Sequence, residues 1–531
     1  MSHKYIPISK IMQKPATELE AHNATWWLDE LGRLRFPYLD GVTELHLATK
    51  AMGEGDHSST EKTSLDSSRV NERILLRKID LRVVPVLCVL YVLAFLDRVN
   101  IGNAALFGLK EDLKLGGSEY NNALVIFFIP YAICDIPANA LMKRFKPHVW
   151  LSVCMFLFGL ITICQGLTQS YGGLLTTRFL LGIFESAMFP GCIYLLAMWY
   201  RRLEAQKRCS FFFGSNNIAG AFGGLLASAI GKMDGIRGYR GWRWVFILEG
   251  VLTCVISFVL FFTISDFPEE ASWLTPTEKE FVKARLREDV GYSQHEKKLT
   301  LRLVWDTVKD VKVILGGFMY FGLIISAYGY AYFAPTIIKE FGHSNIQSQL
   351  LSVPQWVSSL VVLLLVAWLS DRLQHRFLFT ILPILVAVIG FIVLISTDHP
   401  TKVKYGALFL STAGTFSAMP VVLCWFSTNI AGHRRRSIAI AWQVGFGNIG
   451  GIVAAYAFLA EDAPRYFKGY GLCIAFMCFS GLSSCAYLIA CIRENHRRDK
   501  LEDSSEKGGN EFLDEQCSRL GDLSLRYRYM L

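Results

Sequence analysis

The sequence predicts an all-α membrane protein, with twelve transmembrane helices in two six-helix halves and both termini on the cytoplasmic side. Three observations predict this fold class. The chain of 531 residues is 52% hydrophobic and 19% charged, whereas soluble domains carry about 25% charged residues. Its apolar residues fall in runs of roughly 20 residues, the length of a helix that crosses a bilayer. One polar interruption at 266–311 divides these runs into two sets.

Twelve apolar runs are long enough for transmembrane helices. They are expected at about 83–104, 120–141, 149–168, 172–199, 210–231 and 245–265, then at 312–334, 349–369, 377–396, 405–425, 437–459 and 469–492. The resulting plan is an N-terminal tail (1–75), a first half (76–265), a linker (266–311), a second half (312–492) and a C-terminal tail (493–531), with both tails cytoplasmic and mostly disordered. Within the linker, Thr277 is the expected N-cap of a surface helix over 278–287.

Basic loops set the predicted orientation. Lys and Arg gather in the loops after the second, fourth, eighth and tenth helices, which all lie on the side of both tails, so this side is predicted to be cytoplasmic. The net charge of +9 therefore reflects loop composition and does not indicate a nucleic-acid partner. The loop before the sixth helix is also basic, against the trend. The loops at 141–148 and 369–376 resemble each other, and such repeated halves are typical of a transporter that rocks around a central site.

Four ionisable residues interrupt two of these apolar runs. Asp97 and Arg98 lie in the first run, and Arg178 and Glu185 lie in the fourth. A charge at membrane depth costs at least about 2.5–3.5 kcal/mol on insertion scales, so it normally faces a protein interior or a water-filled path. The i, i+4, i+7 spacing of Arg178, Gly182 and Glu185 places them on one helix face. The four charges indicate a site that binds an anion and handles a proton.

The two arginines are the predicted substrate-binding cations. Arg98 and Arg178 are expected at similar depth, where two guanidiniums would clamp a carboxylate through charge-assisted hydrogen bonds. Asp97 and Glu185 would offset these charges in the empty site and, once desolvated, carry the coupled proton. The alternative is a set of fixed ion pairs that join the two helices. Buried pairs rarely improve stability enough to explain themselves, which favours the functional interpretation.

Uncharged polar residues are the remaining candidates for substrate contacts. Such groups orient a planar or hydroxylated ligand without adding charge, although helix packing and interfacial anchoring are the alternative for each of them. The predicted set is Tyr131, Tyr328, Tyr332, Gln443 and Asn448.

Charged residues near helix ends are the predicted gate. Asp371, Arg372 and Arg376 place a carboxylate and two cations after the eighth helix, which suits a salt bridge that forms in one state only. Asp135, near the cytoplasmic end of the second helix, is a further gating candidate. The alternatives are positive-inside charge for the loop and a solvated helix-end carboxylate for Asp135.

Several motifs resemble a known family. LDRVNIGNA (96–104), FFIPYAICDIPANAL (127–141), RFLLGIFESAMFPG (178–191), YRRLEAQKR (200–208) and GWRWVFILEG (241–250) are similar to the fungal anion:cation symporter family of the major facilitator superfamily, which includes allantoate, nicotinate and pantothenate permeases. The resemblance implies proton-coupled uptake of a small organic anion. It assigns substrate binding to Arg98 and Arg178, and proton coupling to Asp97 and Glu185. One departure is the loop LMKRFKPH (141–148), which lacks the acid usual in the wider superfamily; Asp135 is a candidate to compensate.

The sequence therefore predicts a symporter in the plasma membrane that imports a vitamin-like or nutrient monocarboxylate, driven by the proton gradient. Its expected partners are the small organic anion, protons and the lipid bilayer, and a monomer is the expected state. The alternatives are an exporter that exchanges an organic acid or metabolite for protons, and a non-transporting nutrient sensor. An enzyme is not predicted, because no nucleophile motif, His cluster or metal spacing is present. No cofactor is expected.

Overall fold

A computed structural model describes residues 71–142, 145–290, 301–396, 400–430, 433–463, 465–506 and 528–531. In these ranges every regular element is helical, so the predicted all-α class is confirmed. The helices are α4 (Glu72–Leu106), α5 (Leu109–Asp112), α6 (Glu119–Met142), α7 (Pro147–Gly166), α8 (Tyr171–Glu185), α9 (Met188–Trp199), α10 (Arg202–Ile230), α11 (Gly241–Thr263), α12 (Pro276–Val290), α13 (Leu301–Val308), α14 (Val311–Lys339), α15 (Asn345–Leu373), α16 (Arg376–Ile395), α17 (Thr401–Thr428), α18 (His433–Ala455) and α19 (Phe467–Glu506), with short 3-10 turns at Gly231–Met233, Ile236–Gly238 and Ala460–Asp462.

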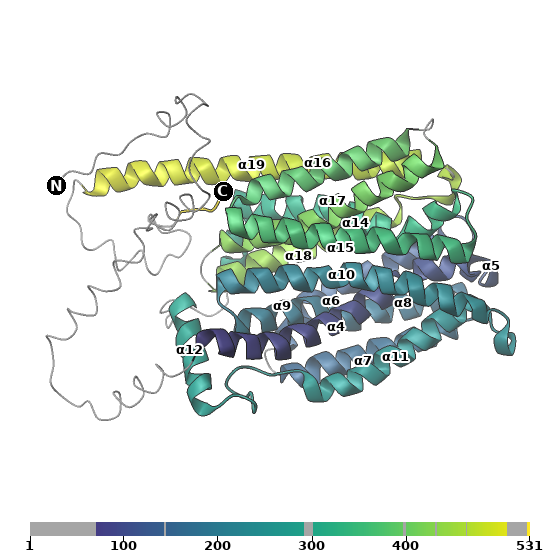
Figure 1. Ribbon diagram of the computed structural model, residues 1–531, viewed down its shortest axis with the longest axis horizontal. Helices are drawn as coiled ribbons and strands as arrows, with labels where there is room; N and C mark the ends of the chain where they lie inside the picture. The colour runs from purple at the N-terminus through teal and green to yellow at the C-terminus, as the bar shows by residue number, and fades with distance from the viewer. Residues whose placement is uncertain are drawn as a thin grey trace, which may run out of the picture. The chain divides into compact units, whose positions relative to one another are not determined.

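Each of the twelve predicted apolar runs contains a long helical segment, and these helices lie side by side in a bundle (Figure 1). Among the described residues, ten helices are long and apolar enough to cross a membrane. The two other long helices, α6 and α10, span 24 and 29 residues. The protein is therefore a polytopic all-α membrane protein, while the count of twelve spans and the cytoplasmic position of the termini stay predictions. Most of the predicted N-terminal tail lies outside the described residues.

The fourth predicted run is divided into two helices, α8 and α9, by a break at Ser186 and Ala187. Pro190 explains the break, because it lacks the N–H that would bond to the carbonyl of Ser186. The last bond of α8 runs from the N–H of Ser186 to the carbonyl of Gly182 at 3.2 Å. The break leaves Glu185 at the end of α8, in the interior of the bundle.

Among the described residues, the two halves meet along four helix pairs: α4 with α14, α6 with α18, α10 with α15, and α10 with α17. Small residues allow these close approaches. A Cβ at Gly102 of α4 would collide with the backbone of Tyr332, and one at Gly220 of α10 would collide with the ring of Trp356. Such close approach is what small residues at helix interfaces allow in a membrane.

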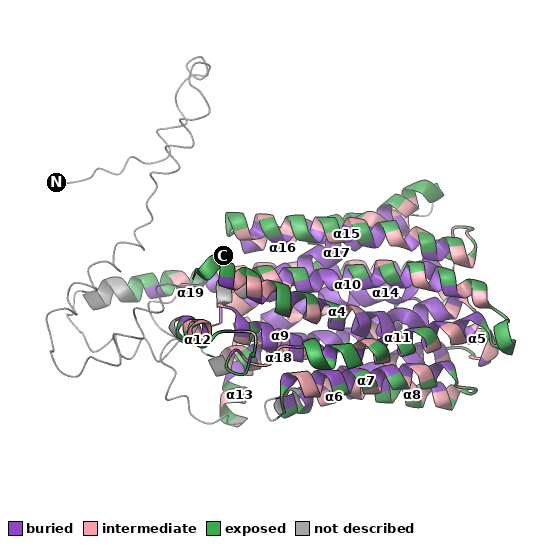
Figure 2. Ribbon diagram, turned by 60° about the horizontal axis from the view of Figure 1, so that its bottom comes forward, coloured by how far each residue is buried: buried purple, intermediate pink, exposed green. Residues whose placement is uncertain are grey.

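The outward faces of the bundle are apolar. Figure 2 shows buried residues toward the interior and exposed ones along the outer surfaces of the helices. The exposed side chains of α11 and α16 are large and apolar: Val251, Val255, Phe258, Val259 and Phe262 on the first, and Leu378, Leu382, Leu385, Ile389 and Ile392 on the second. A water-soluble protein rarely exposes such continuous apolar surface, and contact with lipid tails accounts for it.

The linker helix α12 lies across one end of the bundle (Figure 1). Its buried Arg285 pairs with Glu72 of α4 at 2.9 Å and also with Glu204 of α10. Glu278 of α12 pairs with Lys78 of α4 at 2.8 Å. Burial alone would raise the pKa of Glu278, but the bonds from Lys78 and from the N–H of Thr275 outweigh burial and lower it. The pair therefore stays ionised at neutral pH, and its contribution is lost as the pH falls.

Two boundaries differ from the prediction. Thr275, not Thr277, caps α12: its hydroxyl accepts the N–H of Glu278 at 3.3 Å, and the carboxylate of Glu278 accepts the N–H of Thr275 at 2.9 Å. This reciprocal pair is a capping box, which stabilises a helix start better than a hydroxyl inside the first turn. At the other end of the chain, α19 continues to Glu506, so the first part of the predicted tail 493–531 is helical.

Candidate functional site

Arg98 and Glu185 form a buried ion pair between α4 and α8. The Nε of Arg98 donates to Oε1 of Glu185 at 2.7 Å, and a second guanidinium nitrogen contacts the same oxygen. The side chains are 4% and 0% exposed. Among the described residues, no group bonds to Oε2 of Glu185, so only one of the two carboxylate oxygens accepts hydrogen bonds. Arg98 is therefore held by an internal acid rather than free for a ligand in this state.

Aromatic rings enclose the Arg98 guanidinium. Its carbon lies 5.2 Å from the ring centre of Phe127, 5.0 Å from that of Tyr131 and 5.7 Å from that of Tyr328. Arg98 also donates to the hydroxyl of Tyr328, which reaches it from α14 in the second half. Cation–π contacts of this kind stabilise a desolvated cation without neutralising it. Arg98 thus joins both halves at the centre of the bundle.

Arg178 is buried but only partly bonded. It is 1% exposed, and its Nη1 donates to the backbone carbonyl of Arg98 at 3.2 Å. Among the described residues, no group forms a hydrogen bond with its Nε or Nη2. Gly182 allows α8 to approach α6 closely, because a Cβ there would collide with the carbonyl of Phe127. The two arginines lie near one another, but Arg98 already has an acid partner whereas Arg178 retains two unused donors.

A small cavity of about 20 Å³ lies beside Arg98, with walls from both halves. This volume holds about one water molecule and is too small for an organic anion. Of the predicted substrate contacts, Arg98, Tyr131, Tyr328 and Asn448 line it. Sequence reasoning missed other lining residues, among them Tyr91 and Asn216; for Asn216 a signal existed, because consecutive asparagines interrupt the apolar run of α10.

The other three predicted contacts, Arg178, Tyr332 and Gln443, do not line this cavity. The amide of Gln443 donates to the carbonyl of Gly316 at 3.2 Å, which ties α18 to α14. Tyr332 stacks on Tyr328 with ring centres 5.6 Å apart and lies within electrostatic range of Arg178. Gln443 therefore contributes to helix packing, which was the alternative interpretation of this residue. Tyr332 lies near Arg178 rather than in the cavity.

Asp97 points away from this cluster, toward α11. Its Oδ2 accepts the hydroxyl of Thr253 at 3.1 Å, and its Oδ1 has no partner. The same face of α11 carries Glu249, which is fully buried and was not among the predicted site residues. The site therefore contains three buried carboxylates beside two buried guanidiniums.

The major facilitator superfamily model matches residues 87–455, more than half of the chain. The chain belongs to the major facilitator superfamily. It is 32% identical over 480 residues to the MFS-type transporter cnsO of Penicillium expansum, a match that covers 87% of this chain and 92% of the relative. It is 31% identical over 462 residues to the high-affinity nicotinic acid transporter of Saccharomyces cerevisiae, covering 86% and 85% of the two chains.

A solved structure shares the fold of this transporter. The proton:xylose symporter XylE, bound to 6-bromo-6-deoxy-D-glucose, superposes with a TM-score of 0.59 at 18% identity, covering 77% of this chain and 95% of that one. The predicted resemblance to fungal permeases is thereby confirmed at the level of the family. The protein is a multi-pass membrane transporter of a small molecule and not an enzyme.

The predicted gate of the transporter is only partly assembled. Arg376 pairs with Asp371 at 2.7 Å and also donates to the hydroxyl of Ser370 at 2.8 Å. Arg372 points elsewhere: it is exposed and lies over the ring of Trp368 at 5.4 Å. Asp135 is buried, with one carboxylate oxygen unpartnered and the other facing Gly445 of α18 across the interface between the halves. The structure thus places Asp371 and Arg376 together, and Arg372 and Asp135 apart from them.

Residues 528–531 dock beside this gate. The main-chain oxygen of Leu531 accepts the N–H of Arg376 at 3.1 Å. That of Met530 accepts the indole N–H of Trp425 and the amide of Asn429, both at 2.9 Å.

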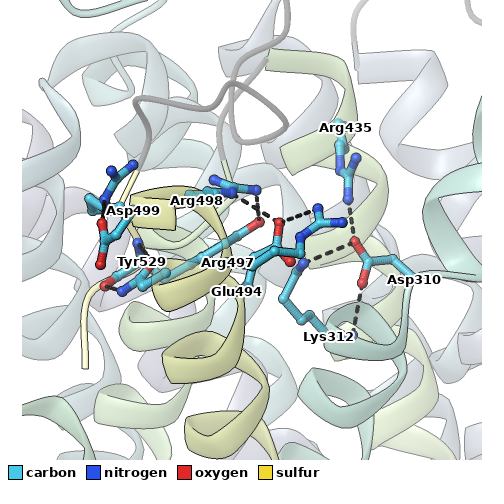
Figure 3. A network of polar contacts seen from close by, with 10 residues as sticks. Asp310, Lys312, Arg435, Glu494, Arg497, Arg498, Asp499 and Tyr529 are labelled. Atoms are coloured by element: carbon cyan, nitrogen blue, oxygen red, sulfur yellow. Dashed lines mark hydrogen bonds and ion pairs between the residues drawn. The ribbon is translucent and has the colours of Figure 1, made fainter. Parts of the chain in front are cut away.

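Tyr529 holds the same segment to α19. Its backbone exchanges two bonds with the amide of Asn495, and its ring contacts Arg498 and Lys312 (Figure 3). Burial alone would raise the pKa of the adjacent Glu494, but bonds from Arg497 and Arg498 outweigh it and lower the pKa. Glu494 therefore stays charged in mildly acidic medium.

Removal of residues 528–531 is expected to lower the apparent thermal midpoint of the detergent-purified protein by a few degrees. Each lost hydrogen bond contributes about 0.5–1.5 kcal/mol, and the segment makes at least four to Asn429, Trp425 and Asn495. Met530→Ala is the matched control, because these bonds involve the main chain of residues 529 and 530 and not the side chain of Met530. A truncated protein as stable as the full chain would contradict the docking.

Proposed function

We propose that this transporter is a symporter that imports a small organic monocarboxylate, of the size of nicotinate, pantothenate or allantoate, together with protons across the plasma membrane. The observation that carries the proposal is the incomplete bonding of Arg178. Two of its nitrogens are buried without a partner, and an unpaired buried cation is costly unless an anion completes it. A substrate carboxylate would supply two acceptor oxygens in the planar geometry that a guanidinium binds best.

Proton coupling would follow from competition for the arginines. In the empty site Glu185 holds Arg98, and Asp97 lies within the field of Arg178. A substrate carboxylate that binds these arginines displaces both acids from their cations. A displaced carboxylate in a dry site binds a proton, because burial penalises its charged form. Anion and proton would then enter the site together.

The substrate class rests on charge and shape. The wall of aromatic rings around Arg98 suits a small ligand with a planar or apolar body and one negative end. A relative named as a nicotinic acid transporter supports this class, although its substrate is a property of that protein. The cavity of about 20 Å³ must enlarge before such an anion fits. Alternation between the observed state and an open one, with the halves moving apart, would provide this space.

Uptake of a panel of labelled carboxylates by cells that express the chain tests the proposal. We expect at least one of nicotinate, pantothenate and allantoate to accumulate above the level of cells with an empty vector, with faster uptake at acidic external pH. A proton ionophore should abolish the accumulation. Uptake that changes neither with pH nor with the ionophore would contradict proton coupling. Accumulation into inside-out vesicles, driven by an imposed proton gradient, would instead indicate export.

A further inference from the structure

Glu249 is a buried acid with no ion-pair partner among the described residues. It lies on α11, is 0% exposed, and neither of its carboxylate oxygens has a hydrogen-bond partner in the part of the chain that the structure describes. An isolated ionised carboxylate in such surroundings costs several kcal/mol, so the group is stable only when it holds a proton or shares one. An ionisable residue at membrane depth is a functional candidate by default.

The geometry brings Glu249 to Asp97. Thr253 follows Glu249 by one helical turn on the same face of α11, and its hydroxyl donates to Asp97 at 3.1 Å. The adjacent side of α11 packs tightly on α7, because a Cβ at Gly250 would collide with the backbone of Gly159. Helix α11 also packs against α4, and the bond from Thr253 places this side of α11 beside Asp97. Asp97 and Glu249 together present three buried oxygens without partners.

The charges around the two acids are unequal. Asp97 lies within electrostatic range of Arg178 and Glu185 of α8 and of Cys254 on α11, although its carboxylate points toward Thr253. Among the described residues, the ionisable group that acts on Glu249 is Asp97. The neighbouring helix α7 contains no Asp, Glu, Lys or Arg, and those of α10 all lie in its first two turns. Arg178 therefore compensates part of the negative charge of Asp97, whereas no cation among the described residues compensates the charge of Glu249.

We propose that Asp97 and Glu249 form a proton-sharing pair, a proton-binding position behind the substrate arginines that supplies the proton to Glu185. The charge balance supports this assignment. The buried cluster has three carboxylates and two guanidiniums, so the empty site is neutral with one proton on the pair. A substrate carboxylate adds one negative charge. The O–H bond on the pair then breaks, a new O–H bond forms on Glu185, and the pair regains a proton from solution. Arg98 is released for the substrate.

Two variants with opposite expected effects test the pair by transport. This arm depends on the proposed symport of an organic anion and uses the labelled carboxylate that the wild type accumulates. Glu249→Gln removes a neighbouring acid, so Asp97 binds its proton more weakly and the pH midpoint of uptake shifts to lower pH by about one unit. Thr253→Val removes a hydrogen bond to ionised Asp97, so the midpoint shifts to higher pH. A merely structural role would reduce the amount of transporter without moving the midpoint.

A second measurement does not depend on the substrate. Infrared spectra of the purified chain in lipid vesicles, titrated with pH, report the carboxylic C=O band of a buried protonated acid. We expect this band in the wild type at neutral pH, its loss in Glu249→Gln, and its persistence to higher pH in Thr253→Val. If no anion is carried, the symport proposal fails while this titration still decides the pair. A wild-type band that Glu249→Gln leaves unchanged, or midpoints that neither variant moves, would overturn the inference. Glu249→Asp retains the acid and should retain the band if Glu249→Gln fails to fold.

Discussion

Uptake is expected to fall by about 100-fold or more when Arg178 is replaced by alanine. Charge-assisted hydrogen bonds contribute about 1.5–3 kcal/mol each, and Arg178 has two unused donors that a carboxylate would occupy. Loss of two such bonds removes most of the binding free energy of a small ligand. The measurement is initial uptake of the labelled carboxylate at acidic pH, normalised to the amount of transporter at the cell surface.

Two controls separate this effect from general damage. Arg237→Ala removes an exposed arginine in the loop before α11 and should leave uptake unchanged. Arg178→Lys keeps the charge but replaces a planar fork with a single point donor, so it should recover only part of the activity. Full uptake by Arg178→Ala would eliminate the arginine from the binding site.

The fold was predictable because the bilayer leaves few choices. Backbone groups in lipid must bond within the helix, so length and apolar composition are enough to locate α4, α7 and α14. The internal break of the fourth run was harder to place. Pro190 was visible in the sequence, but its effect appears one turn earlier, at Ser186 and Ala187, where a carbonyl loses its donor.

The candidate site was predictable in its members but less so in its pairing. The cost of burying charge identifies Asp97, Arg98, Arg178 and Glu185 from the sequence alone. Helix spacing predicts the depth of a side chain in the membrane but not which neighbour it contacts. In the structure Arg98 bonds to Glu185, and Asp97 accepts a bond from Thr253 of α11. These directions depend on how closely the helices approach, which Gly102 and Gly182 permit. The carboxylate clamp therefore stays a prediction about the substrate-bound state.

Glu249 was missed because of a helix boundary. The expected helix began at residue 245, which would place Glu249 just after the first turn, near the helix end, where acids are common and solvated. The actual helix α11 begins at Gly241, one turn earlier, so Glu249 lies two turns inside it and is fully buried. A difference of four residues in a boundary therefore changes a solvated carboxylate into a buried one. Boundaries are the least certain part of a helix prediction, and here a boundary concealed a site residue.

Glu185→Gln is expected to remove the pH dependence of uptake altogether, in contrast to the shifted profile expected for Glu249→Gln. Glutamine keeps the size and an acceptor oxygen for Arg98 but neither ionises nor binds a proton. Arg98 then loses its charged partner and stays available to the substrate at every pH. Net accumulation against a gradient should fail, whereas exchange of labelled for unlabelled carboxylate, which needs no net proton movement, should continue.

The comparison between accumulation and exchange decides the role of Glu185. If the acid only joins α4 to α8, its neutral replacement would weaken both processes equally, because a loosened helix pair affects every transport mode. If it carries the proton, exchange survives while accumulation and pH dependence disappear together. Glu185→Asp is the informative companion: it keeps the ionisable group but shortens the reach to Arg98, so coupling should persist at a reduced rate. Unchanged pH dependence in Glu185→Gln would exclude this residue from proton coupling and leave Asp97, with its partner on α11, as the remaining acid beside the arginines.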